Sequence, residues 1–240
     1  MKITIAYIEE PPFYWTEPDG SIVGADIELA EVVLRAIGYT RIEHQPTTFE
    51  ELLPGVSSGR WNMNVPLFIT PERSLLVDFS TPVWALGDGF LVAAGNPKGL
   101  DSYASIAHRD DAKLAVISDT IQQRSAQSHG VRDTQILQFA RQEEAIDALL
   151  AGRIDAYAAT ALGNRVVAER IGSALVAAVA HTEQNRPPAG AFSFGKHDNK
   201  LRKAVDEQLK HYLGSPDHRQ RMAKYGFTPE EIDPVLKARG

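Results

Sequence analysis

The chain has 240 residues, no cysteine, an apolar fraction of 43% and a formal net charge of −6. This length allows two ordinary domains or one large α/β unit. The negative charge and the lack of a basic run argue against nucleic-acid binding, which needs a basic surface. The lack of cysteine excludes disulfides, thiol nucleophiles and cysteine-based metal sites.

The sequence contains no run of about 18 apolar residues, the length that a membrane-spanning helix needs. The chain opens on "KITIAYI", which is typical of a strand rather than a secretory leader. We expect that a leader has been removed and that the protein is periplasmic.

The first half of the chain alternates strand and helix patterns. A strand is predicted at 3–8, and a helix follows that we expect Asp26 to cap and Gly38 to end. Thr48 and Glu51 have the spacing of a capping box at the start of the next helix.

The segment "ITPER" predicts a third helix start, with Thr70 as N-cap and Pro71 in the first position. Arg73 is unusual there, because the N-terminal end of a helix dipole favours a negative charge.

The second half repeats the alternation after a strand predicted at 89–95. The predicted strands are 113–118, 134–139 and 154–160, and the predicted helices are 119–130, 141–152, one from Asn199 and one from Thr228. Such alternation with short loops indicates an α/β fold with mostly parallel sheets. Two Gly- and Pro-rich segments, 84–89 and 183–190, are suited to two crossings between lobes.

Four segments, in order along the chain, resemble the amino-acid-type (family 3) periplasmic solute-binding proteins of ABC importers. They are "DGSIVGADIELAEVVLRAIGY", "FEELLPGVSSGRWNM", "ITPERSLLVDFSTP" and "LLAGRIDAYAAT". The resemblance implies two Rossmann-like α/β lobes joined by two crossing hinge strands, the type II periplasmic binding protein fold. It places lobe 1 at 1–86 plus 188–240 and lobe 2 at 87–187. It also implies capture of a small ligand by hinge closure.

By the same resemblance, Arg73 binds a ligand carboxylate, and Thr70 assists. A guanidinium matches a carboxylate in both charge and geometry. Thr120 of lobe 2 matches a residue that touches the carboxylate in relatives. Asp119 departs from the family, which often has Gly there.

The usual ammonium site of amino-acid-binding members is altered. Thr160 stands where relatives have an acid, and Phe68 replaces a small polar residue. Glu10, Phe13 and Phe49 also match pocket positions. Together with Phe68 they form a predicted box for a diffuse cation, since ring faces attract poorly hydrated cations. This arrangement resembles members that bind ectoine-type or quaternary-ammonium zwitterions.

Other interpretations stay open for several of these residues. Each Phe is also a natural core residue, and Glu10 is also a natural solvated loop acid. We expect Trp61 and Trp84 to pack at a lobe surface or hinge, and Asp155 to be structural. The seven histidines show no metal-binding spacing.

We therefore expect a monomeric binding protein without cofactor or metal, whose partners are a small zwitterionic ligand and a membrane permease. An alternative is a dehydratase-like enzyme on the same fold, for which Glu10 is the candidate general acid. A sensor input domain is a third possibility. An ordinary amino acid is the alternative ligand.

Overall fold

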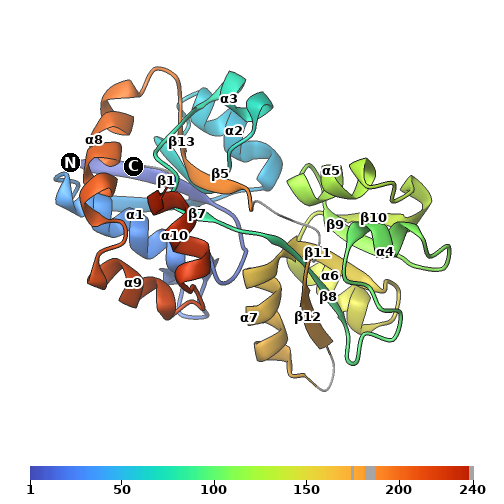
Figure 1. The fold of residues 1–240 in the computed structure, drawn as a ribbon. Coiled ribbons are helices and arrows are strands. Elements are labelled where there is room, and N and C mark those ends of the chain that lie inside the picture. The colour runs from blue at the N-terminus through green and yellow to red at the C-terminus, as the bar shows by residue number, and fades with distance from the viewer. Residues whose placement is uncertain (174–175, 182–186, 238–240) are drawn as a thin grey trace. The chain divides into compact units, whose positions relative to one another are not determined.

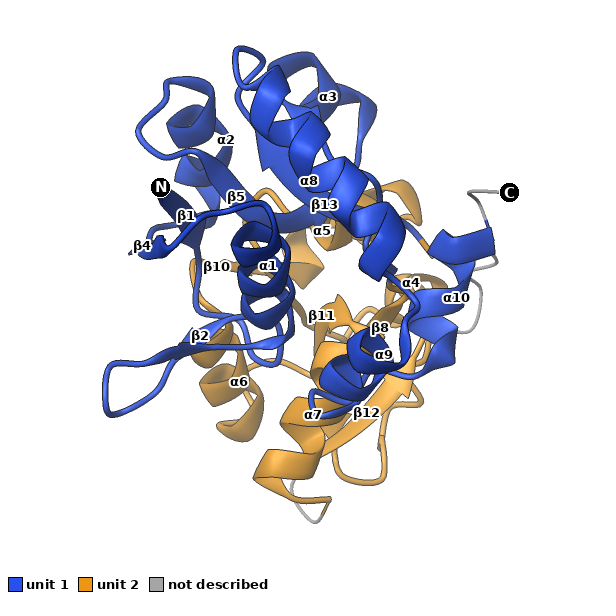
Figure 2. Ribbon diagram, turned by 90° about the vertical axis from the view of Figure 1, so that its left-hand side faces the viewer, with its two compact units in different colours: residues 1–85, 188–240 blue, residues 86–187 orange. Residues whose placement is uncertain are grey.

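The computed structural model describes residues 1–173, 176–181 and 187–237. Its chain divides into unit 1, Met1–Ala85 with Pro188–Gly240, and unit 2, Leu86–Pro187 (Figure 2). The sequence placed these divisions at 86/87 and 187/188. Of the second predicted crossing, residues 183–186 lie outside the described residues.

Unit 1 is built on a mixed sheet of order β4-β1-β5-β13-β6, with β7 also paired to β13. Figure 1 labels β1, β5, β7 and β13 of this sheet. Strands β4 and β5 run parallel to β1, and β13 runs antiparallel to β5, β6 and β7. Helix α1 packs against α8 and α9. The elements are β1 Lys2–Tyr7, β2 Trp15–Thr16, β3 Ile22–Val23, α1 Ala25–Ala36, β4 Arg41–Pro46, α2 Phe49–Ser57, β5 Met63–Phe68, α3 Pro71–Leu76, β6 Asp78–Phe79, β7 Trp84–Ala85, β13 Ala189–Phe194, α8 Asn199–Tyr212, α9 Pro216–Ala223 and α10 Pro229–Lys237.

Unit 2 has a sheet of order β10-β9-β11-β8-β12, in which β8 is antiparallel to both of its neighbours. Two hydrophobic clusters form around it, one with residues of α4 and α5 and the other with residues of α6 and α7. Helices therefore cover both faces, as expected for an α/β sheet. The elements are β8 Asp88–Ala93, α4 Tyr103–Ala107, β9 Leu114–Ile117, α5 Ile121–Ser128, η1 Asp133–Gln135, β10 Ile136–Phe139, α6 Gln142–Leu150, β11 Ala156–Thr160, α7 Ala161–Ile171 and β12 Val176–Ala180.

Paired strands hold both ends of each unit where the chain crosses. In unit 1, Ala85 of β7 is the partner of Ala189 in β13. In unit 2, Gly89 of β8 is the partner of Ala180 in β12, and the backbone N–H of His181 donates to the carbonyl oxygen of Asp88 at 2.9 Å. The two chain ends of each unit thus lie next to each other.

Two of the predicted helix caps are wrong. Gly24 occupies the N-cap position of α1, and Asp26 lies inside its first turn with no exposed surface. The side chain of Thr48 accepts no capping hydrogen bond, and Glu51 pairs with Arg60 instead of closing a capping box. Asp26 accepts a hydrogen bond from Trp84 and Glu51 pairs with Arg60, so the capping pattern alone did not determine the contacts of these carboxylates.

Candidate functional site

The start of α3 places Arg73 as the sequence predicted. The hydroxyl oxygen of Thr70 accepts the backbone N–H of Arg73 at 3.2 Å, and Pro71 is the first helical residue. The guanidinium is buried, and its Nη1 donates to the carbonyl oxygen of Phe68 at 3.0 Å. Its central carbon lies 5.2 Å from the ring centroid of Phe49. A backbone carbonyl and a ring face therefore hold the cation in place.

A series of ring contacts continues from this arginine through unit 1. The centroids of Phe68 and Trp84 are 5.1 Å apart at an interplanar angle of 78°, and those of Trp84 and Phe13 are 6.2 Å apart. Phe13 is buried, whereas Phe68 and Phe49 are half-buried. The three predicted phenylalanines are thus linked through Arg73 and Trp84.

Glu10 lies beside this ring series on the segment that also carries Phe13. Its Oε2 accepts the hydroxyl of Tyr14 at 3.1 Å, and the two residues also form a backbone bridge. Burial raises the pKa of Glu10 to about 7, although the hydrogen bond from Tyr14 acts in the opposite direction. The carboxyl therefore sits near the midpoint of its titration at neutral pH.

A second acid, Asp26, is fully buried and lies close to this group. Its Oδ1 accepts the indole N–H of Trp84 at 3.0 Å. Burial raises the pKa of Asp26 well above its usual range; the bond from Trp84 lowers it and the charge of Glu10 raises it further. Among the described residues, its Oδ2 has no hydrogen-bond partner.

Sequence reasoning missed three members of this group, Trp84, Tyr14 and Asp26. Trp84 is 5% exposed and central to the ring contacts, so a place at the surface is wrong. Its strand β7 nevertheless ends at Ala85, the last residue of unit 1 before the chain crosses to unit 2. Trp61 is buried as well, and its N–H donates to the Oδ1 of Asn64 at 2.6 Å. No local motif separates these side chains from ordinary core residues.

The two predicted residues of unit 2 both begin helices. The hydroxyl of Thr160 accepts the backbone N–H of Gly163 at 3.0 Å and so caps α7. The hydroxyl of Thr120 donates to the carbonyl oxygen of Ile117 at 2.7 Å. A hydroxyl has one hydrogen, so Thr120 has to rotate before it can donate to a carboxylate. Asp119 has a φ of 63°, a conformation that explains why glycine suits this position.

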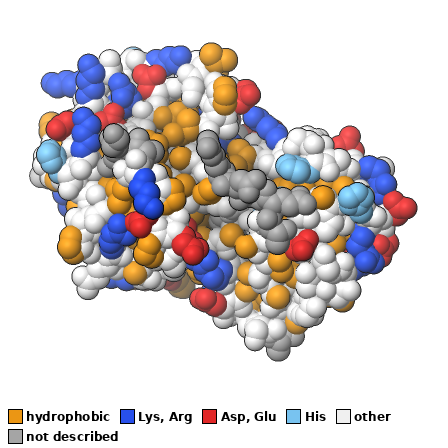
Figure 3. Space-filling view, viewed as in Figure 1, with side chains coloured by type: hydrophobic (Ala, Val, Ile, Leu, Met, Phe, Trp, Pro, Cys, Tyr) orange, Lys and Arg blue, Asp and Glu red, His pale blue; other side chains and the backbone are white. Residues whose placement is uncertain are grey.

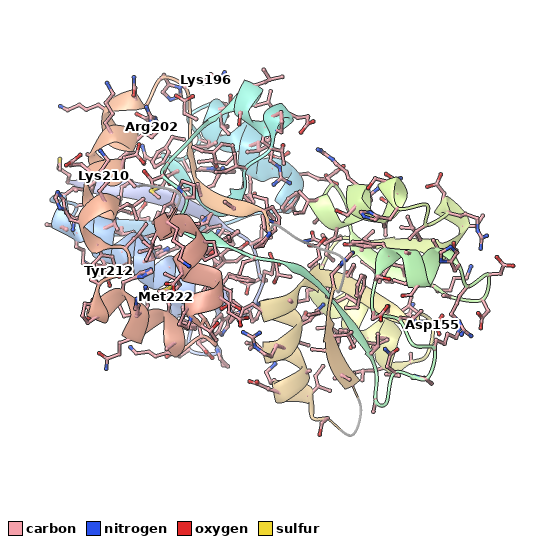
Figure 4. All side chains as sticks on the ribbon, viewed as in Figure 1. Asp155, Lys196, Arg202, Lys210, Tyr212 and Met222 are labelled. Atoms are coloured by element: carbon pink, nitrogen blue, oxygen red, sulfur yellow. The ribbon has the colours of Figure 1, made fainter. Side chains whose placement is uncertain are left out.

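Asp155 has contacts of a structural residue. In unit 2, where Figure 4 labels it, its Oδ2 accepts the backbone N–H of Lys113 at 2.8 Å, and its Oδ1 lies 3.0 Å from the Nζ of Lys98. These bonds tie the start of β9 to the turn before β11. The structural role predicted for Asp155 is consistent with them.

The described residues give no sign of a metal site or a membrane span. No group of three or more His, Asp or Glu side chains within them could hold a metal ion. In that same part of the chain, no helix combines the length and the apolar character needed to cross a bilayer. On the face drawn in Figure 3, acidic and basic side chains are interspersed rather than gathered into one basic surface.

Comparisons with known proteins agree with this architecture. The profile of the "Bacterial extracellular solute-binding proteins, family 3" matches residues 3–228. A "Probable amino-acid ABC transporter periplasmic-binding protein y4tE" of Sinorhizobium fredii is 33% identical over 96% of this chain and 78% of its own length.

Among solved structures, EhuB in complex with hydroxyectoine superposes with a TM-score of 0.89 at 26% identity, over 98% of this chain and 91% of that one. The ancestral amino acid-binding protein AncCDT-1, described as a precursor of cyclohexadienyl dehydratase, has a TM-score of 0.80 at 25% identity, over 93% and 94% of the two chains. The fold is therefore the two-lobe α/β fold of type II periplasmic binding proteins. Since the family profile covers nearly the whole sequence, the chain belongs to the bacterial extracellular solute-binding proteins of family 3.

Proposed function

We propose that this protein is the extracytoplasmic binding component of an ABC importer and captures a small zwitterion that carries a carboxylate and a diffuse cation. The observation that carries the proposal is the buried guanidinium of Arg73, held by the Phe68 carbonyl and the Phe49 ring next to a series of aromatic side chains. A membrane permease is its implied partner, as the name of the Sinorhizobium relative suggests.

The two ends of the ligand would be recognised by different physical interactions. Arg73 supplies a planar, permanently charged donor for the carboxylate. Phe68, Phe49 and Phe13 are the proposed sources of ring faces, of which Phe68 and Phe49 are half-buried and Phe13 is buried. Glu10 is the proposed carboxyl beside them, on the segment that carries Phe13. A delocalised or alkylated cation loses little hydration in such surroundings, whereas a primary ammonium needs hydrogen-bond acceptors. Hydroxyectoine, the ligand in the EhuB complex, carries a delocalised cation rather than a primary ammonium.

An ordinary amino acid is the second candidate ligand, supported by the name of the Sinorhizobium relative. Enzyme activity of the dehydratase type is a separate alternative, since AncCDT-1 is described as the precursor of such an enzyme. We infer binding rather than catalysis, because the profile that matches residues 3–228 is that of solute-binding proteins. Recovery of the bound compound unchanged after long incubation would separate the two.

The test is calorimetric titration of the protein with hydroxyectoine, glycine betaine, L-arginine and L-glutamine. Hydroxyectoine or the betaine should bind most tightly. Arg73→Ala should weaken that binding about 100-fold, since it removes two charge-assisted hydrogen bonds. Phe68→Leu should weaken it about 3- to 30-fold, since it keeps an apolar side chain but removes a ring face.

Arg60→Ala is the matched control. Arg60 also stacks on a ring, 4.9 Å from the centroid of Trp61, but it is exposed and pairs with Glu51. Its loss should leave every affinity unchanged. Tight binding of L-arginine or L-glutamine, with no binding of hydroxyectoine or betaine, would return the protein to the common amino-acid role and refute the proposed ligand class.

A further inference from the structure

A row of three residues crosses neighbouring strands of the unit 1 sheet. Trp84 of β7 is the partner of Gly190 in β13, and Gly190 is in turn the partner of Phe68 in β5. Side chains of directly opposed residues in antiparallel strands lie on the same face. Trp84 and Phe68 therefore point to one side of the sheet, with the glycine between them.

Gly190 leaves the space that the indole of Trp84 fills. A Cβ atom at this position would lie 2.0 Å from the Cη2 atom of Trp84, which no real contact allows. Its φ is not positive, so the requirement for glycine is one of space. Because the indole crosses over the glycine, its ring meets Phe68 edge to face at 5.1 Å.

Asp26 holds the other edge of the indole. The 3.0 Å bond from Trp84 Nε1 to Asp26 Oδ1 joins two side chains that are 5% and 0% exposed. A buried carboxyl with one unpartnered oxygen is destabilising on its own account. Its presence on α1 is explained if the orientation of the indole matters more than the stability that an apolar residue would add.

Trp84 is also the shared neighbour of two rings of the proposed site. Phe68 lies on one side of it, and Phe13 lies on another at 6.2 Å. A shift of the indole would therefore displace both rings together. Cation–π attraction depends on the ring face being turned toward the cation. Displacement of a ring would therefore reduce the affinity for the ligand by more than the loss of apolar contact area alone.

We propose that Trp84, fixed by Asp26 and seated over Gly190, is a positioning residue that orients Phe68 and Phe13 and thereby sets the preference of the site for a diffuse cation over a primary ammonium. The inference rests on the proposed function. Trp84 acts through the two phenylalanine rings.

The experiment measures the affinities of variants of the 240-residue chain for two probes, hydroxyectoine and L-arginine, and reports the ratio of the two affinities. Trp84→Phe should lower hydroxyectoine affinity about tenfold and change L-arginine affinity much less, because it removes the N–H bond and shortens the ring. Asp26→Leu should have the same effect. Asp26→Asn should behave like the wild type, because an amide oxygen still accepts the indole N–H.

Trp61→Phe is the matched control for loss of a buried tryptophan. Trp61 is 6% exposed, donates its N–H to Asn64, and lies over Gly55 at 1.9 Å from a Cβ built there. Among the described residues, it has no ring contact with Phe13 or Phe68. This variant should lower the melting temperature as Trp84→Phe does, but leave the ratio of the two affinities unchanged.

A double-mutant cycle with Phe68→Leu completes the test. If Trp84 acts through Phe68, Phe68→Leu should cost less affinity in the Trp84→Phe background than in the wild type. An unchanged ratio in Trp84→Phe and Asp26→Leu, with Phe68→Leu still changing it, would overturn the inference and leave the proposed function standing. A wild-type preference for L-arginine would overturn both. Should Trp84→Phe fail to fold, Asp26→Leu carries the same comparison.

Discussion

At the scale of single residues, Glu10 and Asp26 of unit 1 illustrate how the surroundings of a carboxyl group change its pKa. Glu10 accepts a hydroxyl and Asp26 accepts an indole N–H, and within the described part of the chain neither carboxyl forms an ion pair. Burial raises the pKa of both carboxyls, that of Glu10 to about 7. The carboxyl of Glu10 is therefore close to changing its charge near neutral pH, and a cation bound beside it would favour the ionised form.

We predict that hydroxyectoine binding strengthens as the pH rises through 7. In the ligand-free protein the carboxyl of Glu10 is mostly protonated at pH 6 and mostly ionised at pH 8, since its pKa is about 7. If the cation binds the ionised form, affinity should increase about tenfold over this interval and level off above it. Titrations in buffers of different ionisation enthalpy would also report the proton that is released.

Glu10→Gln is the control for this pH dependence, and it should bind with one affinity across the same interval. Tyr14→Phe removes the hydrogen bond that lowers the pKa of Glu10. It should therefore move the midpoint of the pH dependence upward. A wild-type affinity that is flat from pH 6 to pH 8 would show that Glu10 does not face the cation.

At the scale of helices and strands, what the sequence predicted depended on local signals. Thr70 and Pro71 predicted the start of α3 correctly, because an N-cap and a first-turn proline act within a few residues. The short strands β6 and β7 and the strand β13 escaped prediction. Strand β13 is the partner of β5, β6 and β7, so its identity depends on residues more than a hundred positions away.

The residues of the candidate site also differ in whether local sequence signals could predict them. Arg73 and Thr70 were recognisable because they belong to a continuous motif. The burial of Trp84 could not be predicted, because the indole lies over Gly190, which only the sheet brings opposite to it. Asp26 was misread as a helix cap because its partner, Trp84, is distant in the sequence. Local patterns cannot reveal a row that three strands assemble.

Thr160 is the N-cap residue of α7 and also a proposed ligand contact, and mutation can separate the two roles. Thr160→Ala removes the hydroxyl that accepts the N–H of Gly163 and should cost about 1 kcal/mol of stability, measured by denaturant unfolding. If Thr160 also contacts the ligand, hydroxyectoine affinity should fall about 2- to 10-fold. Thr160→Ser keeps the hydroxyl and should retain both the stability and the hydroxyectoine affinity.

Ser102→Ala is the control for that experiment. Ser102 caps α4 of the same unit by accepting the N–H of Ser105 at 3.0 Å. Its loss should cost a similar amount of stability and no affinity. If Thr160→Ala follows Ser102→Ala in both measurements, then Thr160 is a helix cap and its proposed ligand contact is wrong.

At the scale of the whole molecule, the chain runs through unit 1, then unit 2, and back to unit 1. Each unit has its own sheet and its own hydrophobic clusters. The six predicted ligand residues of unit 1 are connected by contacts inside that unit. Recognition of both ligand ends is therefore proposed to reside largely in unit 1.

We predict that unit 1 alone folds and keeps the ligand preference. Ala85 and Ala189 are partners on paired strands, so a linker of about four residues can join 85 to 188 in place of unit 2. This shortened chain should unfold cooperatively and bind hydroxyectoine about 10- to 100-fold more weakly, since any contribution of Thr120 and Thr160 is lost. It should still prefer hydroxyectoine to L-arginine, because Arg73, Phe68 and Glu10 remain. Arg73→Ala in the shortened chain should abolish the residual binding. A folded shortened chain that binds neither probe, or binds both equally, would show that the preference does not arise within unit 1.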